Sequence, residues 1–280
     1  MSPDRLWGAW NTDPLVLLGL ATLGWLYARG TLTVWRLAGH GRGVRPWQAM
    51  AFAAGWLALV VALVSPLDAL SESLFAAHMI QHLLLMTVAA PLLALGGPVV
   101  PLAWAWPRPV RQSLARVHAR VHRPMRPLRV LTALPVAFGL HSLALWVRHA
   151  PVLYEAALRN STLHAAEHLV LLGTGILFWS AACWGVTHGG RALGASVLYV
   201  FGLGAQCTGL GALIALSSRP WYGFYAQTSG AWGISPTDDQ VLAGAIMWVP
   251  AGLVYLTLAL VLLGSWLRPL PGSAEQYQSR

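Results

Sequence analysis

The sequence predicts an all-α integral membrane protein: one domain over residues 1–280, built as a bundle of about seven transmembrane helices with its N-terminus outside. The chain is 56% hydrophobic and only 10% charged, and its mean hydropathy is +0.58. Soluble domains carry roughly a quarter charged residues, and a core of this size could not hide so much apolar surface from water. Every fold with an open sheet, and with it most enzyme folds, is excluded in lipid.

Seven apolar segments follow one another along the chain, and we expect each to form one span, at about 20 residues per crossing. They cover residues 14–28, 47–65, 74–95, 130–147, 161–184, 194–216 and 240–266. The first is short, so we expect it to continue towards Trp35, with the long side chain of Arg29 reaching the membrane surface.

Prolines separate several of these spans. The turns that contain them are at Pro66, Pro151, Pro220 and Pro236. Pro91, Pro135 and Pro250 lie within spans, where we expect each to kink or end its helix locally.

The arginines predict the orientation. All eighteen basic residues are arginine, and fourteen of them lie after the first, third, fifth and seventh spans. The other four are Arg5, Arg148, Arg159 and Arg219. Basic residues concentrate in cytoplasmic loops, so the C-terminus is predicted to be cytoplasmic. Cytoplasmic loops therefore account for the net charge of +9, and no nucleic-acid partner is predicted. The arginine-rich segment 108–122 is expected to be a helix in contact with water or lipid headgroups.

Two pairs of histidines lie inside the predicted spans. His78 and His82 are four residues apart in the third span, and His164 and His168 are four apart in the fifth. Each pair therefore shares one helix face. Both spans run inward, which places the first histidine of each pair about 5 Å and the second about 11 Å below the outer end. Ionisable groups are costly in lipid and usually functional, so four imidazoles at one depth predict a metal or haem site.

Other groups approach the same depth. His141 falls about 10 Å below the outer end of the fourth span, and His149 lies just beyond that span. Sulfur groups are added by Met79, Met86, Cys207 and Met247. Imidazoles with thioethers or a thiol suit copper, whereas imidazoles with a carboxylate also suit zinc or iron. Glu167 and Asp68 are expected to orient imidazoles by hydrogen bonds.

Five stretches of the sequence resemble a known family. They are SPLDALSESLFAAHMIQHLLL, APLLALGGP, HAPVLYEAALRN, HAAEHLVLLGTGILFW and DDQVLAGAIMW. From about residue 27 to 248, the chain is similar to the CtaG-type cytochrome c oxidase assembly factors of the multi-spanning kind. The family pattern includes positions that match His78, His82, His149, His164 and His168. It does not include His141, so depth favours His141 and the resemblance favours His149 as a further member of the site.

The resemblance implies a role in the maturation of a haem–copper oxidase, at the copper beside the active-site haem. We therefore predict a non-enzymatic, multi-pass assembly factor of the bacterial cell (inner) membrane. It would hold copper at an outward-facing histidine site and assist its insertion. The expected partners are the catalytic subunit of the oxidase, an extracytoplasmic (periplasmic) copper donor and membrane lipid. The predicted metal ligands are His78, His82, His149, His164 and His168, with Glu167 and Asp68 as their hydrogen-bond partners.

The sequence leaves three alternatives open: an enzyme of one of two kinds, a haem protein and a scaffold. HAAEH matches the HxxEH motif of zinc hydrolases, with Glu167 as base, although such an enzyme also needs a third ligand and a cleft open to water. HMIQH and HAAEH together also resemble the histidine boxes of membrane di-iron oxidases. Histidines of facing helices could instead ligate haem, which would need only one per helix. In a scaffold without metal, they would join helices by hydrogen bonds.

Overall fold

The computed structural model describes residues 3–113, 116, 133–188 and 190–267, and this part of the chain consists of helices and connecting loops without a strand. The first half contains η1 (Pro3–Gly8), α1 (Pro14–Ala38), α2 (Pro46–Leu63), α3 (Pro66–Ser71), α4 (Phe75–Leu83), η2 (Leu84–Ala89), α5 (Ala90–Leu95) and α6 (Val99–Trp104). The second half contains α9 (Leu134–Arg148), α10 (Pro151–Leu158), α11 (Ser161–His188), α12 (Gly190–Ala215), η3 (Tyr225–Gln227), η4 (Ser229–Trp232) and α13 (Pro236–Leu267).

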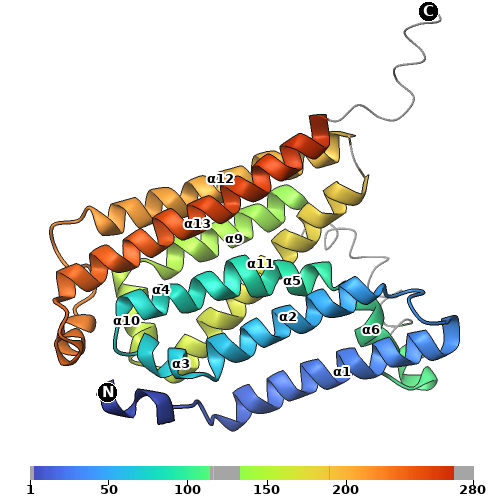
Figure 1. The fold of residues 1–280 in the computed structure, drawn as a ribbon, viewed down its shortest axis with the longest axis horizontal. Coiled ribbons are helices and arrows are strands. Elements are labelled where there is room, and N and C mark those ends of the chain that lie inside the picture. The colour runs from blue at the N-terminus through green and yellow to red at the C-terminus, as the bar shows by residue number, and fades with distance from the viewer. Residues whose placement is uncertain (1–2, 114–115, 117–132, 189, 268–280) are drawn as a thin grey trace, which may run out of the picture.

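Six helical stretches of this described part are long and apolar enough to cross a membrane. They are α1, α2, the continuous stretch Phe75–Leu95, α11, α12 and α13, and α9 is a shorter apolar helix beside them. The predicted polytopic bundle is therefore confirmed. Figure 1 shows the long helices packed side by side, with the N-terminus, α3 and α10 at one end and the connection from α1 to α2 at the other. Both histidine-bearing helices, α4 and α11, begin at the end that holds the N-terminus.

Helix starts and ends agree with the local sequence. The first residues of α1, α3, α10 and α13 are prolines, at a position where the missing amide hydrogen costs no bond. The first helix continues to Ala38, as predicted for the short first segment. Pro135 was expected inside a span, but α9 begins at Leu134, so Pro135 lies in its first turn. The predicted helix 108–122 and the start of the fourth segment at residue 130 fall largely outside the described residues.

The third span changes its helical form in the middle. Residues Leu84–Ala89 form a π-helix between α4 and α5, directly before Pro91. Proline cannot donate to the carbonyl four residues earlier, and its ring crowds that carbonyl, so a regular α-helix is disfavoured here. The indole Nε1 of Trp179 donates to the carbonyl of Met86 at 3.1 Å. Pro250, in contrast, lies inside α13, which continues past it.

The histidine-bearing helix α4 is held at its start by the last helix. The carboxylate of Asp239 in α13 accepts hydrogen bonds from the backbone amides of Phe75 at 2.8 Å and Ala76 at 3.0 Å. An acidic group at the first turn satisfies amides that have no partner within the helix and favours the positive end of the helix dipole. This contact fixes the depth and rotation of α4 relative to α13.

Candidate metal centre

Four histidines from α4 and α11 meet at one end of the bundle. The Nε2 atoms of His82 and His168 are 3.1 Å apart, and the rings of His78 and His164 stack with centroids 5.3 Å apart. One ring nitrogen each from His78, His82 and His168 lie within 4.8 Å of one another. The two pairs that the sequence places at one depth thus form a single cluster, the histidine cluster. Metal–nitrogen bonds of about 2.0 Å around one ion put ligand atoms about 3.5 Å apart, so modest side-chain rotation would close this set.

His78 presents an unused nitrogen to the cluster. The hydroxyl of Tyr225 donates to the carbonyl of Ser71 at 3.2 Å and lies 3.1 Å from Nδ1 of His78. Because the hydroxyl of Tyr225 donates its only proton to the carbonyl of Ser71, Nδ1 of His78 donates to the hydroxyl oxygen. The other ring nitrogen, Nε2, then carries no proton and keeps its lone pair. Nε2 of His78 is buried without a hydrogen-bond partner among the described residues, and so is Nε2 of His164. Buried nitrogens in this state are the form in which imidazoles ligate metals.

Arg148, the last residue of α9, contacts the cluster. Its Nη2 lies against Nδ1 of His82. A guanidinium only donates, so Nδ1 of His82 accepts, and the proton of the neutral ring is on Nε2. That proton is donated to Nε2 of His168, which leaves the proton of His168 on its Nδ1. This chain of contacts fixes one arrangement of protons in the cluster.

Arg148 is buried and has no carboxylate partner. Its side chain is 5% exposed, and neither Nε nor Nη1 has a hydrogen-bond partner in the described part of the chain. The single ion pair of this part joins Arg159 to Glu155 at 3.3 Å. Glu167 is half-buried in α11, and no hydrogen bond joins it to an imidazole within the described ranges. In the sequence, Arg148 is one of four arginines outside the arginine-rich loops, and only its position next to His149 points to a role.

Asp68 reaches the cluster indirectly. Its Oδ1 accepts from Nε2 of Gln81 at 2.7 Å, and its Oδ2 accepts from Nδ2 of Asn11 at 2.8 Å. Burial raises the pKa of Asp68, and these two hydrogen bonds oppose that rise. Gln81 also donates to the carbonyl of Ala62 at 2.8 Å, so it links α4 to α2 and α3. Asp68 therefore orients Gln81, the residue before His82, and not an imidazole as its position in the sequence predicts.

The two candidate histidines of the fourth span lie in different surroundings. His149 donates from Nδ1 to the carbonyl of Leu145 at 2.7 Å, and its Nε2 is buried without a partner among the described residues. Burial, with the neighbouring charge of Arg148, lowers the pKa of His149 to about 3, so the ring is neutral. His141 lies 2.9 Å through Nδ1 from Oγ1 of Thr174. His149 lines a cavity together with His82, and His141 does not.

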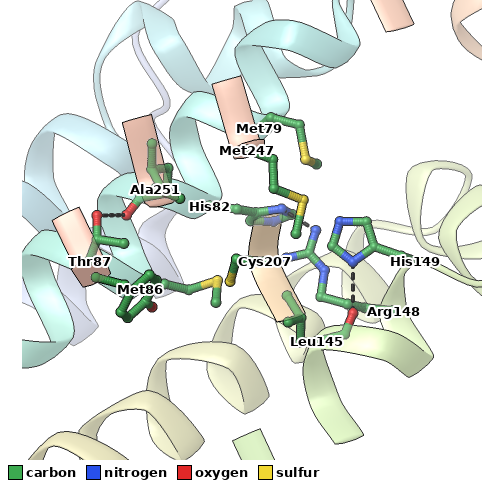
Figure 2. Close-up of a pocket in the computed structure, with 12 residues that line it drawn as sticks. Met79, His82, Met86, Thr87, Leu145, Arg148, His149, Cys207, Met247 and Ala251 are labelled. Atoms are coloured by element: carbon green, nitrogen blue, oxygen red, sulfur yellow. Dashed lines mark hydrogen bonds between the residues drawn. The ribbon is translucent and has the colours of Figure 1, made fainter. Parts of the chain in front are cut away.

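This cavity has a volume of about 20 Å³, which suits one water molecule or one ion. Figure 2 shows it between α4, the end of α9 and the two last helices, with His82, Arg148 and His149 on its wall. The four sulfur groups that the sequence places at this depth all line it: Met79, Met86, Cys207 and Met247. We call it the sulfur-lined cavity.

Comparison with known proteins identifies one family. The family described as cytochrome c oxidase caa3 assembly factor matches residues 25–269. The match includes the histidine cluster, Arg148 and the sulfur-lined cavity. No curated protein and no solved structure matches the chain.

Proposed function

The chain belongs to the cytochrome c oxidase caa3 assembly factors, and we propose that it holds copper at the histidine cluster and passes it to the catalytic subunit of the oxidase. Family membership makes the chain an assembly factor for cytochrome c oxidase, and its helices make it a membrane protein. The copper cargo, its extracytoplasmic donor and the bacterial cell membrane as location are part of the proposal.

One observation carries the proposal: ring nitrogens of His78, His82 and His168 converge within 4.8 Å. These donors are neutral and borderline soft, and no carboxylate belongs to this set among the described residues. Such donors suit copper better than magnesium, calcium or manganese, which prefer oxygen. A set of single imidazoles also allows ligands to be exchanged one at a time, which a carrier needs and which a closed four-thiolate cage does not offer.

The proposal is tested by replacing His82 or His168 with alanine in cells that depend on the oxidase. We expect the copper content of the purified oxidase to fall at least about tenfold, since loss of a metal ligand commonly costs that much or more. Immunoblots of membranes would show the assembly factor at its normal level. The matched control is His141→Gln, which changes a buried histidine outside the cluster. Normal oxidase copper in both alanine variants would contradict the proposal.

The zinc-hydrolase reading of HAAEH makes a different prediction for Glu167. As a general base, Glu167 would be indispensable, and Glu167→Gln would abolish function. In a copper carrier, the same change removes no ligand of the cluster and would weaken oxidase assembly only modestly. Absorption spectra of the purified protein test the haem alternative, because a bound haem gives a Soret band and copper–imidazole coordination does not.

A further inference from the structure

The sulfur-lined cavity collects polar atoms that have no partner. Nε2 of His149, Nε and Nη1 of Arg148 and the hydroxyl of Tyr255 are all buried without a hydrogen-bond partner in the described part of the chain. All three side chains line this cavity. Buried polar groups are nearly always satisfied in native proteins, so several orphans around one small space indicate an occupant.

His149 is held in the tautomer that can bind a metal through Nε2. Its Nδ1 donates to the carbonyl of Leu145, which fixes the ring and leaves the lone pair on Nε2. A hydrogen bond from one ring nitrogen to a backbone carbonyl is the usual arrangement behind a metal-binding histidine. In Figure 2, the ring of His149 lies beside the guanidinium of Arg148, and the thioether of Met247 lies on the same side of the ring. His149 is 4% exposed, so this nitrogen is closed to solvent.

Sulfur groups complete the wall of the cavity. Met86 in η2, Cys207 in α12 and Met247 in α13 are buried side chains from three different segments. Together with Met79, three of the six methionines of the chain and one of its two cysteines meet at a space that holds one ion. Soft thioether and thiolate ligands suit monovalent copper, as well as zinc and iron–sulfur clusters, and do not suit magnesium, calcium or manganese. The π-helix that carries Met86 is also a feature found frequently at functional sites.

The charges around the sulfur-lined cavity favour Cu(I) over a divalent ion. Arg148 already places one positive charge beside the cavity, and no carboxylate among the described residues forms an ion pair with it, although Glu167 acts on it electrostatically. A Cu(I) ion bound by a Cys207 thiolate is a neutral unit, so it adds no net charge in the membrane interior. The guanidinium also stabilises the thiolate. A divalent ion at the same ligands would add one net positive charge beside Arg148 in a medium of low dielectric, which is costly.

We propose that the sulfur-lined cavity is a second metal site, specific for Cu(I), with Nε2 of His149, the thiolate of Cys207 and the thioethers of Met86 and Met247 as ligands. The identity of the cargo rests on the proposed function. When the S–Cu bond forms, the thiol proton passes to the surrounding water, and no electron is transferred. Copper then has two adjoining positions, one with sulfur and one with imidazole ligands, and His82 borders both.

The test uses the full-length protein in nanodiscs, loaded anaerobically with Cu(I) against a chromophoric chelator of known affinity. The wild type should bind two ions, and X-ray absorption should find sulfur in the first coordination shell. Cys207→Ser combined with Met247→Leu should bind one ion and lose the sulfur signal, with the affinity at that site at least about 100-fold weaker. The matched control, Cys183→Ser with Met50→Leu, changes the same residue types away from the cavity and should behave as wild type.

A third variant separates this proposal from the proposed function. His78→Ala with His168→Ala removes the histidine cluster and should retain one sulfur-bound copper. Copper bound by nitrogen alone, and unaffected by Cys207→Ser with Met247→Leu, would overturn the second site while the histidine cluster stands. Sulfur-bound copper at full stoichiometry in the cluster variant would overturn the histidine cluster and support the second site. Absence of copper in the wild type would overturn both.

Discussion

Arg148 and a metal ion cannot both use His82. When a neutral imidazole ligates a metal through one nitrogen, its other nitrogen carries the proton. If Nε2 of His82 binds the metal, Nδ1 becomes a donor and faces the donor Nη2 of Arg148. If Nδ1 binds the metal, the ion takes the place of the guanidinium. In both cases, loading of the histidine cluster requires Arg148 to leave His82, so the arginine opposes metal binding and favours release.

This competition predicts the effect of removing the guanidinium. In the background of Cys207→Ser with Met247→Leu, which isolates the histidine cluster, Arg148→Leu should raise the affinity for Cu(I) at least about tenfold. The estimate follows from the 1.5–3 kcal/mol typical of a hydrogen bond from a charged group, at about 1.4 kcal/mol per tenfold. Chelator competition measures the affinity. The control is Arg159→Leu, which removes an exposed arginine that pairs with Glu155 and should leave the affinity for Cu(I) unchanged. An unchanged or lower affinity in Arg148→Leu would contradict the competition.

For individual residues, the sequence predicted that the four histidines lie at one depth, but it did not predict which residues surround them. The four cluster histidines could be placed because the helical rise converts sequence position into depth. Arg148 could not, because a count of arginines by loop does not say whether a side chain at the membrane boundary turns inward. Tyr225, which lies against His78, is the first residue of the short helix η3, 147 positions away in sequence, and no periodic pattern links them.

Glycines set the distance between α12 and α13, the two helices that carry Cys207 and Met247. A Cβ atom added at Gly211 would lie 2.7 Å from the backbone nitrogen of Trp248 and 2.8 Å from the carbonyl oxygen of Gly244. These separations are shorter than a carbon atom tolerates. Small residues at such positions let membrane helices approach backbone to backbone. The cavity between these helices and α4 exists at its present size because of this approach.

We therefore expect Gly211→Val to force α12 and α13 apart. Overpacking of this kind costs about 1–3 kcal/mol, so the protein should unfold several degrees lower in detergent than the wild type. Gly209→Val is the matched control, because it makes the same change in the same helix at a position with nothing within 4 Å. Thermal unfolding followed by size-exclusion chromatography measures both. Equal unfolding temperatures would show that the glycine does not set the helix spacing.

Among the elements, the long spans were predictable and the short ones were not. An apolar segment of about 20 residues is sufficient to predict a span, whereas α3 and α10 are too short to give such a signal. Pro91 predicted a local break in the third span. The break takes the form of a π-helix, and the indole of Trp179, 93 residues away, hydrogen-bonds to it. Long-range contacts of this kind are not encoded in the local sequence.

In the whole molecule, the two sites and the arginine-rich connection from α1 to α2 lie towards opposite ends of the bundle. The helices α4 and α11 begin at the bundle end that holds the N-terminus. The four histidines of the cluster lie in α4 and near the start of α11, and the sulfur-lined cavity shares His82 with the cluster. The connection from α1 to α2, rich in arginine, lies at the opposite end. If arginine marks the cytoplasmic side, then both sites face the outside, where an extracytoplasmic donor could load them.

Cysteine labelling in spheroplasts tests this orientation. A membrane-impermeant maleimide should label Ser161→Cys, at the exposed start of α11, in intact spheroplasts. It should label His40→Cys, in the exposed connection from α1 to α2, only after the membrane is opened. The wild type is the background control, because its Cys207 is buried and its Cys183 lies within α11. The reverse pattern would place both copper sites towards the cytoplasm, and delivery from an extracytoplasmic donor would then be excluded even if the protein binds copper as proposed.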